Sequence, residues 1–323
     1  MGGANRGTVR RMVEPLQVAG LLRVGDESAA VGDAMRRAAR RGDMRRVHRG
    51  AYVGAEHWKG LGPEARHRVE VRAALAAARS DVLVSHQSAA VVWGLPVVGA
   101  PLRRVHLTFV GASGGVSRGA VSRHVTSASP PESMVDGIRV TSAGRTVVDL
   151  ARAAGLLAGV VAADAALRAK LVTPGQLAEE LEAAGKGRGV RVARDVVAFA
   201  DGLSESPGES LSRVRMRQLG LPGPVLQREF SDHVGFVGRV DFWWEDVRVV
   251  GEFDGRAKYE QDGDLEAERR RLWEEKLREN RLRATGATVA RWTWADAWAG
   301  APMAAALLQA GVRPPVRRPT HRS

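Results

Sequence analysis

The 323-residue sequence contains no cysteine, which excludes disulfides and thiolate zinc sites. Any bound metal must therefore be held by oxygen or imidazole ligands. The sequence also lacks a run of about 18 apolar residues, so we predict no membrane-spanning helix and no membrane partner. The N-terminal segment MGGANRGTVRRMV is charged but has no long apolar core behind it, so we predict no signal peptide. These absences favour a cytoplasmic protein.

Basic residues are abundant and unevenly placed. Lysine and arginine total 49 against 36 acidic residues, a net charge of +13 that predicts nucleic acid as a partner. Solubility in an Arg-rich, Ala-rich proteome is the alternative explanation. Residues 1–54 hold eleven Arg against five acids, whereas residues 205–300 hold sixteen basic against eighteen acidic residues. The positive field thus belongs to the N-terminal end, and carboxylates are concentrated in the C-terminal third.

The N-terminal region, residues 1–56, has the outline of a winged helix. We expect residues 13–40 to be helical and a short hairpin to form around His48-Arg49-Gly50. A helix of this kind reads the DNA major groove while arginines of the wing bind phosphate. A basic surface helix with no ligand is the alternative. The candidate DNA-binding residues are Arg36, Arg37, Arg40, Arg41, Arg45, Arg46 and Arg49.

Residues 57–200 are predicted to form a mixed α/β domain. Strands are expected at residues 82–84, 105–110 and 138–141, and residues 111–119 form a Gly/Ser-rich turn. Helices are expected at 65–79, 87–93, from 143, at 160–168, after a Thr173 cap, and at 190–200. Ser85, His86 and Asp149 are not interpreted as a hydrolase triad, because no nucleophile elbow is present. We interpret His86, His106 and His124 as structural residues.

The polar segment 201–209 is the predicted boundary of a last domain, residues 205–300. We expect a helix at 208–219, strands at 225–230, 240–244 and 248–254, a helix at 265–285 and a strand at 288–293. Residues 301–323 are predicted to form a C-terminal helix and a basic tail. The fold class predicted for the whole chain is therefore α/β (α+β).

An acidic constellation carries the chemistry of this last domain. Glu252 and Asp254 are two residues apart on one strand, so they point to the same face. Asp241 lies on the preceding strand, joined by a tight turn, and we expect the three carboxylates to converge. Such a cluster is unfavourable without a cation, and Mg²⁺ prefers oxygen ligands. A solvated hairpin is the alternative, but the stretch 247–253 is strongly apolar.

The segments RVDFWWEDVRVVGEFDGRAKY and EEKLRENRLRATGATVARWTW resemble the Vsr-type branch of the PD-(D/E)XK nuclease superfamily. The resemblance covers about the last hundred residues before the tail. It implies a restriction-endonuclease-like α/β sandwich that hydrolyses DNA phosphodiesters with Mg²⁺. The matching catalytic and metal-binding positions are Asp241, Glu252 and Asp254, with Glu209 in SPGESLSR as a further metal ligand.

One position departs from that superfamily. The pattern places a lysine two residues after the strand glutamate, where Asp254 stands in this sequence. Lys258 and Lys276 are the candidates to serve the site from another element, and a solvated surface position is the alternative for each. If neither lysine reaches the carboxylates, the domain binds DNA without cutting it.

Upstream, the segments RRGDMRRVHRGAYV, VLVSHQSAAVVWGLP and GIRVTSAGRTVVDLARAA resemble AbiEi-type antitoxins of type IV toxin–antitoxin systems, over roughly residues 10–200. Residues 13–34 depart from the helix-turn-helix pattern of that family. The resemblance implies a transcriptional repressor with a cognate toxin as partner. Two functions are thus expected: a DNA-binding Mg²⁺-dependent endonuclease, or alternatively a non-catalytic antitoxin and repressor. A partner-binding protein with no nucleic-acid role is the remaining possibility.

Overall fold

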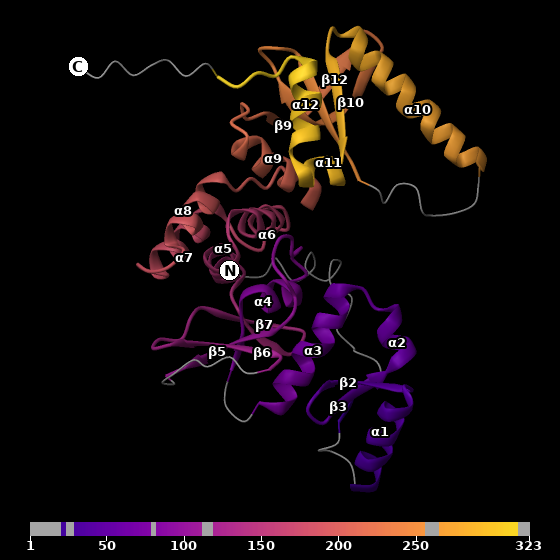
Figure 1. Cartoon of the computed structure of the whole chain (residues 1–323). Coiled ribbons are helices and arrows are strands. Elements are labelled where there is room, and N and C mark those ends of the chain that lie inside the picture. The colour runs from indigo at the N-terminus through magenta and orange to yellow at the C-terminus, as the bar shows by residue number, and fades with distance from the viewer. Residues whose placement is uncertain (1–20, 24–28, 79–81, 112–118, 256–264, 316–323) are drawn as a thin grey trace, which may run out of the picture. The chain divides into compact units, whose positions relative to one another are not determined.

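The computed structural model describes residues 21–23, 29–78, 82–111, 119–255 and 265–315 (Figure 1). The chain forms two compact units, Met1–Ala200 and Asp201–Ser323. The division falls at the start of the polar segment 201–209. Both units combine helices with sheets, which confirms the predicted α/β (α+β) class. Within the described residues, no helix has both the length and the apolar composition needed to cross a membrane.

The first unit begins with a small sheet of order β1-β3-β2, built from β1 (Leu22–Arg23), β2 (Met44–His48) and β3 (Ala51–Gly54). The hairpin predicted here is confirmed, and Gly50 turns it in the left-handed region with φ 74°. The helix expected within 13–40 is wrong in its middle part: α1 is Ala29–Arg41, because Leu22 pairs with Tyr52 as a strand. Residues 13–20 and 24–28 of that expected helix lie outside the described residues. Helix α2 (Ala55–Gly60), which was not predicted, follows β3.

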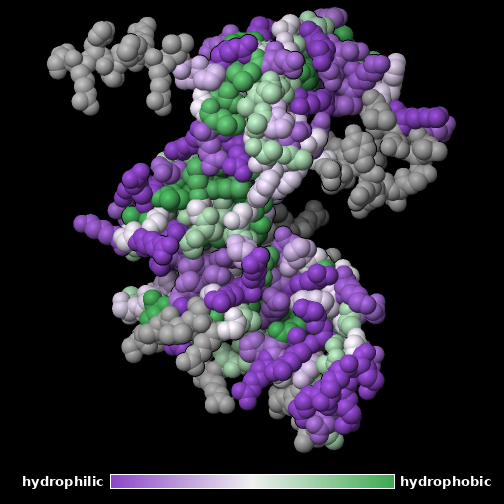
Figure 2. All heavy atoms as spheres, in the orientation of Figure 1, coloured by the Kyte–Doolittle hydropathy of each residue, from purple (hydrophilic) through white to green (hydrophobic). Residues whose placement is uncertain are grey.

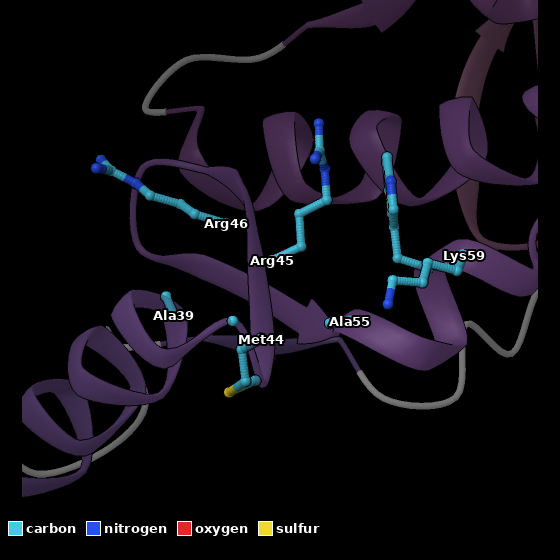
Figure 3. A pocket seen from close by; sticks show the side chains of 8 residues that line it. Ala39, Met44, Arg45, Arg46, Ala55 and Lys59 are labelled. Atoms are coloured by element: carbon cyan, nitrogen blue, oxygen red, sulfur yellow. The ribbon is translucent and has the colours of Figure 1, made fainter.

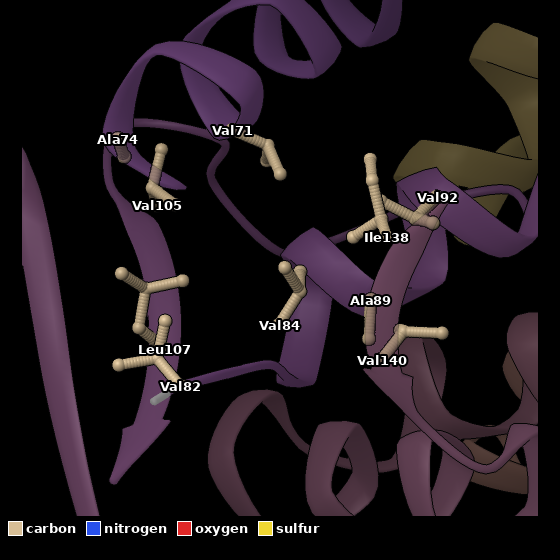
Figure 4. Packing of buried hydrophobic residues seen from close by; sticks show 10 residues of the cluster. All are labelled: Val71, Ala74, Val82, Val84, Ala89, Val92, Val105, Leu107, Ile138 and Val140. Carbon is tan, nitrogen blue, oxygen red and sulfur yellow. The ribbon is translucent and has the colours of Figure 1, made fainter. Parts of the chain in front are cut away.

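A five-stranded sheet of order β6-β5-β4-β8-β7 forms the centre of the first unit. Its strands are β4 (Leu83–Val84), β5 (Val105–Val110), β6 (Val121–Thr126), β7 (Glu132–Val135) and β8 (Ile138–Thr141), with α3 (Pro63–Ala77) and α4 (His86–Trp93) against one face. Figure 4 shows the core between them, where Val105, Leu107 and Val140 meet Val71 and Val92. Alternation along β5 turns His106 away from this core. The strands predicted at 105–110 and 138–141 are confirmed, β6 and β7 were missed, and most of the predicted turn at 111–119 lies outside the described residues.

Four helices complete this unit: α5 (Ala143–Ala154), α6 (Leu156–Arg168), α7 (Pro174–Ala183) and α8 (Val190–Phe199). Thr173 caps α7 as predicted. The side chain of Gln176 accepts the backbone N–H of Thr173, which completes a capping box. Gly159 lets α6 approach its neighbours, since a Cβ there would lie 2.6 Å from Val196 and 2.8 Å from Ala151.

The second unit is a four-stranded sheet of order β12-β11-β10-β9. Strands β9 (Val225–Asp232), β10 (Gly235–Trp244) and β11 (Val249–Asp254) are antiparallel, and β12 (Thr288–Thr293) is parallel to β11. The parallel pair needs a crossover, which α10 (Leu265–Ala284) supplies. Helix α9 (Pro207–Gln218) precedes the sheet, and α11 (Trp294–Ala299) and α12 (Ala301–Ala310) follow it. The predicted order of helix, three strands, helix and strand is confirmed.

The two faces of this sheet are covered by different helices. Helix α9 packs closely on one face: Gly208 lies under the ring of Phe253, and Ser212 accepts a hydrogen bond from the indole of Trp292 at 2.8 Å. On the other face, Leu282 of α10 is fully buried in a cluster with Trp243 and Val250. Side chains two residues apart on a strand share a face, so Asp241 lies on the same face as Trp243, and Glu252 on the same face as Val250. This is the face that α10 covers.

Candidate carboxylate site and basic surface

Polar side chains form a row across the second sheet. The register of β9 with β10 puts Gln227 opposite Asp241, and the pairing of Phe242 with Gly251 brings Asp241 level with Glu252. On the parallel side, Glu252 pairs with Arg291 of β12. Four neighbouring strands therefore contribute one polar side chain each at the same level of the sheet.

Asp241 stands where the pairing of β10 and β11 ends. The last paired residues are Phe242 and Gly251, and beyond them the Oδ2 atom of Asp241 accepts the backbone N–H of Phe253 at 2.8 Å. The carboxylate thus takes the place of the backbone carbonyl that would accept this N–H in a regular pair of strands. Its negative charge raises the pKa of both Glu252 and Glu209. Asp241 is therefore within electrostatic reach of both glutamates.

The pKa of Glu252 in this row is strongly raised. Its side chain is buried, and Nη2 of Arg278 on α10 donates to its Oε1 at 2.8 Å. Burial, together with the charge of Asp241, raises the pKa of Glu252 to about 7, against the opposing effects of the Arg278 and Arg291 guanidinium groups. The two arginines therefore do not offset the cost of burying this carboxylate in its ionised form.

Glu209 joins the cluster from the first turn of α9. Ser206 caps the helix by accepting the N–H of Glu209, and Oε2 of Glu209 accepts from the Glu205 backbone at 2.8 Å and from Gln227 Nε2 at 3.0 Å. Burial and then the charge of Asp241 raise the pKa of Glu209. Gln227 has a φ of 53°, in the left-handed region that a side chain rarely adopts. The amide that bridges Glu209 to the row is therefore held in a strained backbone position.

Asp254 shares a face with Glu252 but has a different partner. Its Oδ1 faces Nη1 of Arg291 at 3.3 Å, and the same guanidinium also pairs with Glu275 and Glu279 of α10. Among the described residues, the oxygens of Asp241, Glu252 and Asp254 do not gather into a ready three-ligand arrangement. The expected convergence of the three carboxylates is therefore wrong: Glu252 and Asp254 each pair with a different arginine instead.

Of the two candidate lysines, Lys276 is the one that the structure describes, and it lies away from these groups. Lys276 is exposed on α10, because the sheet-facing side of that helix carries Glu275, Arg278, Glu279 and Leu282. Lys258 lies outside the described residues. The cations that reach the carboxylates are Arg278 and Arg291, neither of which the sequence analysis had proposed. Arg291 could have been found by aligning the last strand beside the third one and following which side chains share a face. The position of Arg278 beside Glu252 depends on the path of the crossover helix, which the sequence pattern does not give.

The predicted DNA-binding arginines lie on α1 and the β2–β3 hairpin of the first unit. Arg36, Arg37, Arg40 and Arg41 are exposed, and hydrophilic side chains cover α1 on the face seen in Figure 2. Arg36 pairs with Asp33 and Arg41 with Asp43, while Arg49 is exposed at the hairpin turn.

A hollow of about 500 Å³ lies beside this hairpin. Arg45, Arg46 and Lys59 line it together with Trp58, and the Arg45 guanidinium lies 5.1 Å from the centre of the Trp58 ring. Figure 3 shows the side chains of Arg45 and Arg46 extending in different directions from β2. Lys59 pairs with Glu56 at 2.8 Å, and Arg46 donates to the carbonyl of His48 at 3.3 Å. The guanidinium groups of Arg45 and Arg46 are of the kind that binds phosphate.

Comparison with known proteins adds a partial relationship. No family model matches the chain. It is similar to two uncharacterized proteins, MT2308 and Rv2248, from two strains of Mycobacterium tuberculosis, each 35% identical over 120 residues. The match covers 37% of this chain and 44% of each relative, so the chain spans less than half the length of the relatives it matches.

Proposed function

We propose that the chain is a DNA-binding protein whose second unit is a Mg²⁺-dependent, endonuclease-like module acting on DNA phosphodiesters. One observation carries the proposal: buried Glu252 lies level with Asp241, and Asp241 raises the pKa of both Glu252 and Glu209. Buried acids whose pKa is perturbed by burial and by a neighbouring charge are typical of functional sites. The order of strands and helices also agrees with the nuclease fold that the sequence resembles.

The carboxylate oxygens of the row are the donor type that a hard divalent cation prefers, but three of them do not converge in this structure, so binding would require these side chains to move together. Asp241 and Glu252 would hold Mg²⁺ through their carboxylate oxygens, with Glu209 as a further ligand and Asp254 beside them. When bound, the ion supplies an activated water and offsets charge that develops on the phosphate. The observation that supports such an ion is that Glu252 is buried near the charge of Asp241 and that Arg278 and Arg291 do not offset the resulting rise in its pKa.

Two arginines of the second unit have roles in the same proposal. Arg278 and Arg291 project guanidinium groups beside Glu252 and Asp254. Guanidinium groups bind phosphate oxygens in a bidentate manner, so these side chains would position the DNA strand to be cut. In this role they replace the lysine that the superfamily pattern places after the strand glutamate.

The first unit would supply affinity for duplex DNA. Its exposed arginines on α1 and the hairpin neutralise phosphates, a contribution that does not depend on base sequence. Both activities require access to DNA, and we propose a cytoplasmic location on that ground.

Plasmid nicking tests the enzymatic proposal. Purified protein should nick supercoiled plasmid in Mg²⁺ and not in EDTA, and Asp241→Asn and Glu252→Gln should each abolish nicking. Glu229→Gln is the matched control, because Glu229 is an exposed acid on β9 of the same sheet. Equal nicking by the wild type and the Asp241 and Glu252 variants would identify a contaminating nuclease and refute the proposal.

A second candidate is a non-catalytic antitoxin that represses transcription and binds a cognate toxin. The Arg278–Glu252 ion pair and the exposed position of Lys276 favour it, since both suit a module that no longer cuts. It predicts salt-sensitive binding to the promoter of its own gene that EDTA does not weaken. Binding without salt dependence, together with no rescue of cells from a co-expressed partner toxin, would exclude this function.

A further inference from the structure

Three histidines from three segments converge in the first unit. His86 is the first residue of α4, His106 lies in β5 and His124 in β6. Strands β5 and β6 are parallel and pair Thr108 with His124, so His106, on the same face as Thr108, lies diagonally beside His124. The backbone N–H of Ser85 donates to the carbonyl of His106 at 3.1 Å, which brings His86 to the same place.

The ring nitrogens are close enough to share one ion. Nδ1 of His106 lies 2.9 Å from Nε2 of His124, and one nitrogen from each of the three rings lies within 4.8 Å of the others. The His86 ring stacks on that of His124 with centroids 3.7 Å apart. Nitrogens bound to a tetrahedral zinc ion lie roughly 3.3 Å apart, given bonds of about 2.0–2.1 Å. An ion would replace the hydrogen bond between the rings of His106 and His124, and their nitrogens would move apart by a few tenths of an ångström.

The three imidazoles lie in partly buried surroundings. All three side chains are half-buried. On the opposite face of β5, Val105 and Leu107 are buried in the core, so the strand that carries His106 is held in place.

Ser85 provides the outer contact that ligating histidines usually have. Its Oγ lies 3.0 Å from Nδ1 of His86 and accepts a hydrogen bond from the Thr108 hydroxyl at 2.8 Å. This contact leaves Nε2 of His86 as the nitrogen available to an ion and fixes the orientation of the ring. His86 itself has a φ of 53°, a backbone position that is unfavourable outside glycine. The structure thus holds His86 in place against local strain.

We propose that His86, His106 and His124 form a three-imidazole site for Zn²⁺ with an open fourth position. Imidazole suits zinc and neighbouring transition metals, whereas Mg²⁺ and Ca²⁺ prefer oxygen. Three protein ligands with a vacant position is the arrangement of zinc sites that bind water or an external ligand. The zinc site uses no residue of the proposed nuclease, which lies in the other unit. The two proposals can therefore be tested independently.

Metal titration of the full chain tests the proposal. Metal-free protein should bind one equivalent of Co²⁺ with the visible spectrum of a nitrogen-ligated ion, and Zn²⁺ should displace it. His106→Gln and His124→Gln should each weaken binding by about 10-fold or more, since each removes a direct ligand. The matched control is His57→Gln, because His57 is exposed on α2 of the same unit. Asp241→Asn shows whether the carboxylate site contributes to the signal.

Thermal melts separate a lost site from a lost fold. His124 lies on the edge strand β6, where a substitution disturbs the sheet least. Zinc should raise the melting temperature of the wild type and of His57→Gln but not that of folded His124→Gln. The proposal is overturned if the wild type binds neither ion, or if His106→Gln and His124→Gln bind them as tightly as the wild type.

Discussion

The pH dependence of stability offers a direct test of the environment of Glu252. We predict that Glu252→Gln makes the second unit less sensitive to pH between about 5 and 8, because it fixes this position in an uncharged form. Burial raises the pKa of Glu252 from its ordinary 4.5 to about 7 in the folded protein. The folded state therefore binds this proton more tightly than the unfolded state does.

The sign and size of the effect follow from that difference. Stability from the protonated carboxyl is fully present below pH 4.5 and is lost as pH rises through about 7. Each pKa unit corresponds to about 1.4 kcal/mol, so the ionisation costs the folded state about 3 kcal/mol at pH 8 and above. Because Glu252 is only 8% exposed, solvent screens little of this cost. Glutamine avoids the cost, so the variant should gain about 3 kcal/mol relative to the wild type between pH 5 and pH 8.

Urea unfolding at a series of pH values, followed by tryptophan fluorescence, measures this gain. Six of the eight tryptophans lie in Asp201–Ser323, so the signal reports mainly on the second unit. The comparison of interest is the difference in unfolding free energy between Glu252→Gln and the wild type at each pH. Titrations elsewhere in the chain largely cancel in that difference. The exposed Glu229→Gln control should follow the wild type throughout.

Parallel curves for wild type and Glu252→Gln would refute the argument, since they would mean that Glu252 ionises as easily in the folded chain as in the unfolded one. Repeating the series with Mg²⁺ extends the test. An ion that binds the ionised carboxylates stabilises the folded state only above the pKa of Glu252. The loss of stability with rising pH should therefore shrink in Mg²⁺ for the wild type and not for the variant.

Three further predictions concern packing, hydrogen bonding and charge. A Cβ on Gly208 would lie 2.0 Å from the Phe253 ring, so Gly208→Ala should destabilise by about 1–3 kcal/mol in urea unfolding, whereas Gly223→Ala, with nothing within 4 Å, should be nearly neutral. Ser212→Ala leaves the buried indole N–H of Trp292 without its acceptor and should cost about 1–3 kcal/mol, while exposed Ser231→Ala should cost little. Neutralising the hairpin arginines together should lower the slope of log affinity for DNA against log salt by about three in filter binding; an unchanged slope would remove the hairpin from the interface. That triple variant replaces Arg45, Arg46 and Arg49.

The second sheet could be predicted because its strands are short apolar runs bounded by turn residues. The run Val249–Asp254 alternates so that Glu252 and Asp254 share one face, and the structure has the same strand. The strand at 288–293 was predicted for the same reason. Local patterning was thus sufficient for the elements and for the level at which the acids stand.

What could not be predicted depends on contacts between distant segments. Arg278 meets Glu252 only because α10 crosses above the sheet, and no local pattern encodes that crossing. His106 and His124 meet because β5 and β6 pair in parallel, and β6 has no clear strand signal in its sequence. The early start expected for α1 failed because Leu22 finds a strand partner in Tyr52, and tertiary pairing outweighed helical periodicity.

A buried carboxylate can be protonated, paired with a fixed cation or bound to a metal ion. Which of these holds for Glu252 bears on the choice between the two functions proposed. A fixed arginine that served only to neutralise it would hold its pKa below the ordinary value. Arg278 does not achieve this, because burial and the charge of Asp241 outweigh its effect and the pKa of Glu252 still rises to about 7. Ionisation of Glu252 is therefore unfavourable in the folded chain, and a divalent cation beside its carboxylate would lower that cost. On this ground we prefer the nuclease proposal over the silent module.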